Sequence, residues 1–211
     1  MLLRSISAWM LFLASIVFIF NDTASAHCDS MEGPVVKASQ KALETGNINY
    51  VLIWVQAKDE KEIKEMFDKV NKVRSLGPEA KELTDMYFLE TVVRLHRMGE
   101  GEGYTGLKPV GYKPEKGIEV ADNAIETNSI DKLLSGLNKK HHAKIKEYFV
   151  GLQSKKNYDV NDVKGGREYV EAYVHFIHYV EDLYSGEEKN IKGHNHNKKL
   201  KGALNVRNYV N

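Results

Sequence analysis

The chain has 211 residues, of which 30 are Lys or Arg and 29 are Asp or Glu, so that the formal net charge at pH 7 is +1. The basic and acidic residues are interspersed, and the sequence therefore lacks the basic stripe that nucleic-acid binding requires. Cys28 is the only cysteine, which excludes an internal disulfide and means that packing must stabilise the fold.

The first 26 residues have the order of a secretory signal peptide. Arg4 precedes an apolar stretch over residues 9–20, and small residues then end the segment at Ala26. The apolar stretch is shorter than the roughly 20 residues that a membrane-spanning helix needs, so we expect cleavage after Ala26 rather than a retained anchor. The mature protein would then begin at His27, be exported to the periplasm or the extracellular space, and keep no membrane span.

Helical patterns dominate the chain that follows. Gly46 is placed to end the first helix, whose apolar and small residues recur at helical spacing. Gly77-Pro78 ends one helix and starts the next, because proline is favoured in a first helical turn. The helix expected over residues 48–57 is apolar on several sides, which suits a buried helix, although residues 50–54 also fit a strand. The helices expected in this half span residues 35–45, 48–57, 60–76 and 78–98.

The second half of the chain resembles the first. A shift of 82 residues, which places Leu43 on Ile125, aligns three separated patches without a gap. The first two patches align residues 42–45 with 124–127 and residues 63–67 with 145–149. The third patch aligns Tyr87 with Tyr169, Val92 with Val174, Leu95 with Ile177 and His96 with His178. We therefore predict an all-α helical bundle of two tandem pseudo-symmetric repeats.

Glycine and proline separate the two halves, since the segment between them includes Pro109 and Pro114 and cannot hold a regular helix. The last residues are rich in Lys, Asn and Gly, and we expect them to be disordered. The expected divisions are a signal peptide (1–26), an N-terminal hook (27–33), helical repeat 1 (34–99), a Gly/Pro linker (100–115), helical repeat 2 (116–184) and a polar tail (185–211).

Polar residues form a stripe at spacings of three and four on the last long helix, and the stripe includes Glu171, His175 and His178. Such a stripe is typical of a solvated face. The repeat argues otherwise, because Glu171 and His175 fall on Leu89 and Val93 of the first half, which predicts a partly buried face. Buried carboxylates and imidazoles need partners or a metal ion.

His96 has apolar neighbours on its own helix face, where a hydrogen-bonded core histidine is the common outcome. Its equivalence to His178 offers another interpretation, in which the two imidazoles close a metal site or hold a b-type haem between helices. The attachment motif C-x-x-C-H is absent from the sequence.

The hook carries the sharpest chemical signal. Cleavage before His27 would free an α-amine beside an imidazole, followed by the thiol of Cys28 and the carboxylate of Asp29. An amine and an imidazole on a first-position histidine chelate copper or nickel in the manner of a histidine brace, and a thiolate favours the same soft metals. The alternative is that these are ordinary residues at a frayed terminus.

The segment from His27 to Gly33 resembles the metal-binding hook of nickel superoxide dismutase, a helical bundle whose mature chain begins His-Cys-Asp-x-x-Cys-Gly. The resemblance implies that His27 and Cys28 are metal ligands, but Glu32 stands where that family has its second cysteine. The mature region as a whole resembles an uncharacterised family of exported bacterial proteins, which begin His-Cys-Asp-x-x-x-Gly-Pro-Val-Val and share a motif found here at residues 167–181.

These observations predict an exported, transition-metal-binding helical protein, with nickel or copper as the metal. Whether it is a redox enzyme related to superoxide dismutation or a metal carrier stays open. The alternative is a binding or scaffold protein of the cell envelope that uses no metal. The expected metal ligands are His27, Cys28, His96, Glu171, His175 and His178.

Overall fold

The structure is a computed structural model that describes residues 27–186. The expected signal peptide and nearly all of the expected polar tail lie outside the described residues. Within the described range the all-α prediction is confirmed: the residues form α-helices and two short 3-10 helices, and β pairing is limited to an isolated bridge between Ser30 and Lys108. No helix over these residues has the length and apolar character needed to cross a membrane.

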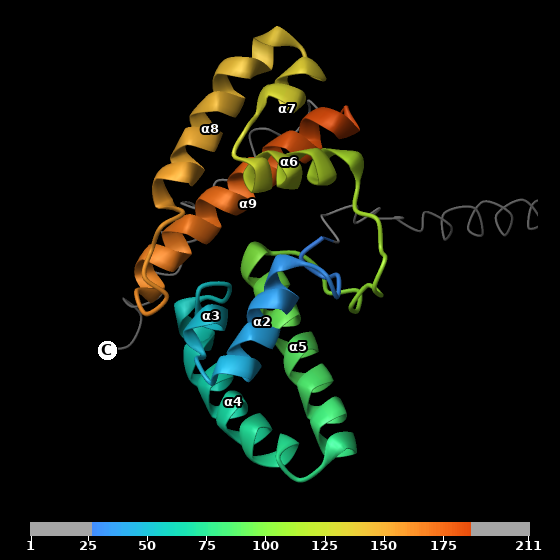
Figure 1. Cartoon of the computed structure of the whole chain (residues 1–211), viewed down its shortest axis with the longest axis vertical. Helices are drawn as coiled ribbons and strands as arrows, with labels where there is room; N and C mark the ends of the chain where they lie inside the picture. Colours follow the sequence, from blue (N-terminus) through green and yellow to red (C-terminus); the bar gives the residue numbers. More distant parts are fainter. Residues whose placement is uncertain (1–26, 187–211) are drawn as a thin grey trace, which may run out of the picture.

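The helices form two groups (Figure 1). The first group holds α2 (Pro34–Thr45), α3 (Asn49–Leu52), the 3-10 helix Ala57–Asp59, α4 (Glu60–Arg74) and α5 (Pro78–Glu100). The second holds α6 (Lys116–Thr127), α7 (Asp131–Ser135), the 3-10 helix Lys139–His141, α8 (His142–Lys155) and α9 (Val163–Ser185). In each group one long helix packs against two others, α5 against α2 and α4, and α9 against α6 and α8.

The element order of the two groups matches at the shift found in the sequence. Helix α2 begins at Pro34 and α6 begins at Lys116, and both are 12 residues long. Gly46 ends α2 with φ of 72°, and Asn128, at the corresponding position, ends α6 with φ of 53°. Both residues adopt the left-handed conformation that closes helices. The pseudo-symmetry of the packed repeats stays a prediction, since matching bounds establish only the order of the elements.

The helix expected over residues 48–57 is wrong in length, because α3 ends at Leu52. The backbone carbonyls beyond that point are used by side chains instead of a continued helix. Arg167 donates hydrogen bonds to the carbonyls of Leu52 and Val55, and the ring of His96 contacts the Trp54 carbonyl. Residues 51–55 are all buried. Helix α3 contacts α2, whereas Trp54 contacts His96 on α5 and Tyr173 on α9.

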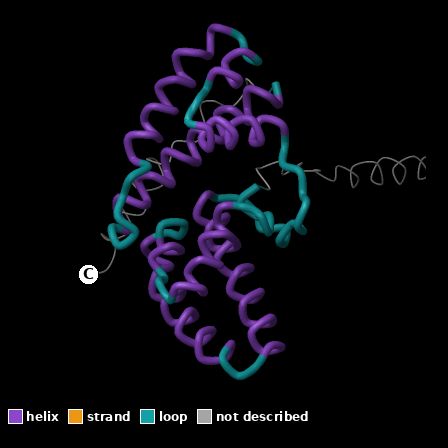
Figure 2. Tube along the Cα trace, viewed as in Figure 1, coloured by secondary structure: helices purple, strands orange, loops and turns teal. Residues whose placement is uncertain are grey.

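The turn after α3 also joins the two groups. The indole of Trp54 packs edge-on against the ring of Tyr173 on α9, with 5.8 Å between the ring centroids. Gly166 on α9 lies so close to Ile53 that a Cβ there would overlap the isoleucine side chain. The expected linker is a crossover loop from α5 to α6 (Figure 2). Ile53 and Trp54 are therefore closely packed against α9.

Candidate functional site

The hook, residues 27–33, is packed against the helices. Cys28, Asp29 and Ser30 are 6%, 1% and 5% exposed. Backbone hydrogen bonds tie the hook to the crossover loop, from the Met31 amide to the Lys108 carbonyl and from the Lys108 amide to the Asp29 carbonyl. The hook is therefore packed against the helices and hydrogen-bonded to the crossover loop.

His27 contacts the second helix group. Its Nε2 lies 2.8 Å from Oδ2 of Asp122 on α6, and the Tyr173 hydroxyl donates to the other oxygen of that carboxylate at 3.1 Å. A carboxylate only accepts, so the short contact requires the proton of the imidazole on Nε2. The other ring nitrogen, Nδ1, is buried and has no hydrogen-bond partner among the described residues. The ring thus presents an unused nitrogen on the side away from Asp122.

Cys28 is a buried, neutral thiol. Burial raises its pKa well above the usual value, and the nearby negative charge of Glu100 raises it further, while Arg97 acts in the opposite direction. A thiol must lose its proton to bind a metal ion. Ligation by Cys28 would therefore require the metal to displace a firmly held proton.

A chain of buried charges runs from the hook to the end of α5. The Nε of Arg97 lies 3.5 Å from Oδ1 of Asp29, and its Nη1 lies 3.4 Å from Oε2 of Glu100. Burial raises the pKa of Asp29, and the positive charge of Arg97 offsets part of that effect. Breaking one member of such a chain leaves an uncompensated charge in the interior.

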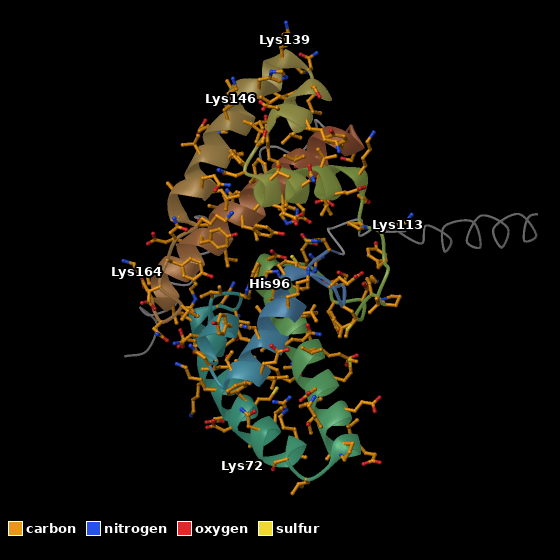
Figure 3. The ribbon with its side chains drawn as sticks, in the orientation of Figure 1. Lys72, His96, Lys113, Lys139, Lys146 and Lys164 are labelled. Atoms are coloured by element: carbon orange, nitrogen blue, oxygen red, sulfur yellow. The ribbon has the colours of Figure 1, made fainter. Side chains whose placement is uncertain are left out.

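His96 is held at the same end of α5, which faces the second helix group (Figure 3). The side chain is 3% exposed, and its Nδ1 lies 2.9 Å from the Trp54 carbonyl oxygen, which can only accept. The Nε2 lies 3.4 Å from Oε1 of Glu100, but neither atom has a hydrogen-bond partner among the described residues. Because Nδ1 carries the proton donated to Trp54, the neutral form of the His96 ring presents Nε2 as an acceptor beside Oε1 of Glu100.

A pocket of about 210 Å³ opens beside these atoms, between the two helix groups, and we call it the junction pocket. Its lining residues are Ile53, Trp54, Val55, Gln56, His96, Gly99, Glu100, Glu102, Arg167, Val170, Glu171, Val174, His175 and His178. The face of α9 that was expected to be partly buried forms one wall of this pocket. His175 and His178 are half-buried there, whereas Glu171 is exposed.

His178 is paired within its own helix. Its Nδ1 lies 3.0 Å from Oε2 of the buried Glu181. Burial lowers the pKa of His178, but the hydrogen bond to Glu181 and the negative charge of Glu100 more than offset this, so the pKa is raised overall. The imidazolium is thus favoured, and a metal ion would have to compete with a proton for this side chain.

The structure therefore divides the six expected ligands into two places. His96, Glu171, His175 and His178 line the junction pocket, whereas His27 and Cys28 are not among its lining residues. In residues 27–186, no three side chains of His, Cys, Asp or Glu form a group that could hold a metal ion. The idea that the four pocket residues complete the hook site stays a prediction.

The family of unknown function DUF6448 matches residues 32–179. The chain belongs to this family. No curated protein and no solved structure matches the chain. The DUF6448 match bears out the expectation of an uncharacterised family, and it includes all four pocket residues while beginning after His27 and Cys28.

Several residues that shape the hook and the junction pocket were missed in the sequence. Glu100 lies one helical turn after His96, but the expected helix ended at residue 98, so the pair was not placed on one face. Arg97 lies in the last turn of α5, where basic residues are common, so its sequence position does not indicate burial. Asp122 gave no signal, because its partners His27 and Tyr173 are distant in sequence.

Proposed function

We propose that this protein is an exported metal-binding protein that holds a nickel or copper ion at its processed N-terminus through His27 and Cys28. One observation carries the proposal: the Nε2 of His27 contacts Asp122, while its Nδ1 is buried and without a hydrogen-bond partner among the described residues. Metal-binding histidines commonly show this division, with one nitrogen oriented by a carboxylate and the other left for the metal.

The α-amine supports the same assignment. Cleavage after Ala26 would place a primary amine on the residue whose Nδ1 is unused, and these two groups form a chelate with one metal ion. The site then consists of an amine, an imidazole and the Cys28 thiolate. This site uses the α-amine and only two side chains. It is therefore compatible with the finding that no three His, Cys, Asp or Glu side chains in residues 27–186 form a group that could hold a metal ion.

The resemblance to the nickel superoxide dismutase hook supports nickel as one candidate metal, but the second thiolate of that hook is missing. Glu32 occupies its place, and the Glu32 carboxylate accepts a hydrogen bond from the Gly111 amide at 2.8 Å. Two versions of the function therefore follow, a redox enzyme related to superoxide dismutation and a metal carrier. Further ligands would come from His96, Glu171, His175 or His178.

The test compares the mature chain beginning at His27 with the same chain carrying one extra glycine before His27. Both are titrated with nickel or with copper under reducing conditions, and bound metal is measured by elemental analysis after desalting. We expect one metal ion per mature chain and a large loss of affinity in the extended chain, because its α-amine is displaced while every side chain is unchanged.

Equal binding by the two chains, or no binding by either, would contradict the proposal. The latter result would favour the alternative of an envelope binding or scaffold protein that uses no metal. A superoxide assay on the loaded mature chain separates the remaining versions, since a carrier binds metal stoichiometrically without turnover.

A further inference from the structure

We propose that the junction pocket, which His27 and Cys28 do not line, is a second binding site for a small organic amine with an apolar body. The polar end of the pocket carries the argument. Nε2 of His96 and Oε1 of Glu100 are 3.4 Å apart, and neither has a hydrogen-bond partner among the described residues. A buried acceptor without a donor is destabilising, so a ligand that donates to both atoms is favoured at this position.

Both acceptors are held in place by their other atoms. The Nδ1 of His96 donates to the Trp54 carbonyl, which leaves the lone pair of the neutral ring on Nε2. The second carboxylate oxygen of Glu100 accepts from Arg97 at 3.4 Å. A primary ammonium group carries three N–H donors and can reach both acceptors from one position.

The charge of the lining favours a cation. Three carboxylates line the pocket, those of Glu100, Glu102 and Glu171. Arg167 is the one permanently charged basic side chain among the described lining residues, and it is paired with Glu60 at 2.8 Å. His178 also lines the pocket, and Glu181 balances its positive charge. Glu100 is paired with Arg97, so the negative charge that remains in the pocket comes from Glu102 and Glu171.

The size and walls of the pocket favour an organic body over a bare metal ion. A single water molecule occupies about 30 Å³ in the liquid, so a pocket of about 210 Å³ has room for a small molecule. Its apolar walls come from Ile53 and Trp54 on one side and from Val170 and Val174 on the other. Small-molecule sites combine mostly apolar walls with a few fixed polar groups in this way.

Trp54 provides a specific readout, because it is the only tryptophan in residues 27–211 and it lines the pocket. The mature chain is titrated with n-butylamine and 2-phenylethylamine in the presence of a metal chelator, and Trp54 fluorescence is followed. 1-Butanol and butyrate serve as neutral and anionic probes of matched shape. We expect saturable changes with the amines and much weaker ones with the alcohol and the acid.

Two variants test the contacts. Glu100→Gln removes a charged acceptor and should weaken amine binding by about tenfold to a hundredfold, whereas Glu44→Gln, at an exposed position on α2, should leave it unchanged. Val174→Phe fills the pocket without altering either acceptor and should abolish binding, with helicity confirming the fold. If Glu100→Gln impairs folding, amine binding by Val174→Phe alone tests the proposal.

Binding of 1-butanol as tight as that of n-butylamine would overturn the proposal, as would unchanged amine binding in Val174→Phe. The absence of a saturable response to either amine would also overturn it. Because the chelator is present throughout, failure of the metal site at the hook would not affect these results.

Discussion

His27 contacts Asp122 through Nε2 and Oδ2 at 2.8 Å, although the first residue lies in the hook and the second on α6 of the other helix group. The hook reaches the first group as well, because Asp29 pairs with Arg97 on α5. A segment of seven residues therefore contacts both groups at the surface where they meet. Changes at that surface should affect both the stability of the fold and the chemistry of the hook.

Asp122 is expected to orient His27 for metal binding. Replacing it by alanine should lower the affinity of the mature chain for nickel or copper by about tenfold to a hundredfold, because the ring loses the carboxylate that fixes its proton. Tyr173→Phe is the matched control, since it removes the other hydrogen bond to Asp122 but leaves the contact with His27. Competition titration against a calibrated chelator measures both; an Asp122→Ala affinity equal to wild type would contradict the assignment.

Arg97 should be among the most sensitive positions for folding. Arg97→Met removes the cation between Asp29 and Glu100, leaves two carboxylates in the interior, and should lower the free energy of unfolding by about 3–5 kcal/mol. Adding Asp29→Asn to that variant should recover part of the loss, because one of the stranded charges disappears. Urea unfolding followed by circular dichroism measures the effect. A double variant less stable than the single one would refute the electrostatic explanation.

Gly166 should not tolerate a side chain. A Cβ there would overlap Ile53 and would lie 3.0 Å from the Tyr158 ring, so Gly166→Ala should cost about 1–3 kcal/mol of stability. Gly151→Ala is the matched control within α8, where no atom lies within 4 Å of the added carbon. That change should stabilise the helix by about 0.5–1 kcal/mol. Thermal unfolding of the two variants should shift in opposite directions; a shift in the same direction would mean that Ile53 can move aside.

The pairing of His178 with Glu181 should make stability depend on pH. Because the pKa of His178 is raised in the folded state, its contribution is fully present below the unfolded value of about 6.5 and is lost as the pH rises through the folded pKa. His178→Asn should therefore differ most from wild type on the acidic side of this range and least on the alkaline side.

Glu181→Gln provides a second check on the same pair, since it keeps the imidazole and removes the carboxylate that accepts from it. Urea midpoints between pH 6 and 9 should show a flatter profile in this variant. If both variants kept the wild-type slope, the pH dependence would have to come from other groups.

Local signals made most of the fold predictable. Gly46 and Pro78 mark helix boundaries by their own backbone preferences, and the structure places boundaries at both. The turn after α3 was not predictable in this way. The carbonyls of Leu52 and Val55 bind the side chain of Arg167, which is more than a hundred residues away in sequence.

The same difference between local and long-range signals explains which site residues could be predicted from the sequence. His175 and His178 were found because helical spacing places them on one face, and the structure puts both in the wall of the junction pocket. Asp122 and Arg97 were missed because each acts through residues on other elements, His27 and Asp29. No local pattern distinguishes a buried arginine from one in solvent.

The contacts of the hook also determine the order in which the chain can fold. Residues 27–29 leave the ribosome early, but Arg97 and Asp122 are synthesised much later, so the hook cannot be buried until both helix groups have formed. Contacts between distant residues form slowly. The thiol of Cys28, which is buried in the folded chain, is consequently open to oxidants until the hook packs. A chain halted before α6 would lack Asp122, which contacts His27, the residue next to Cys28.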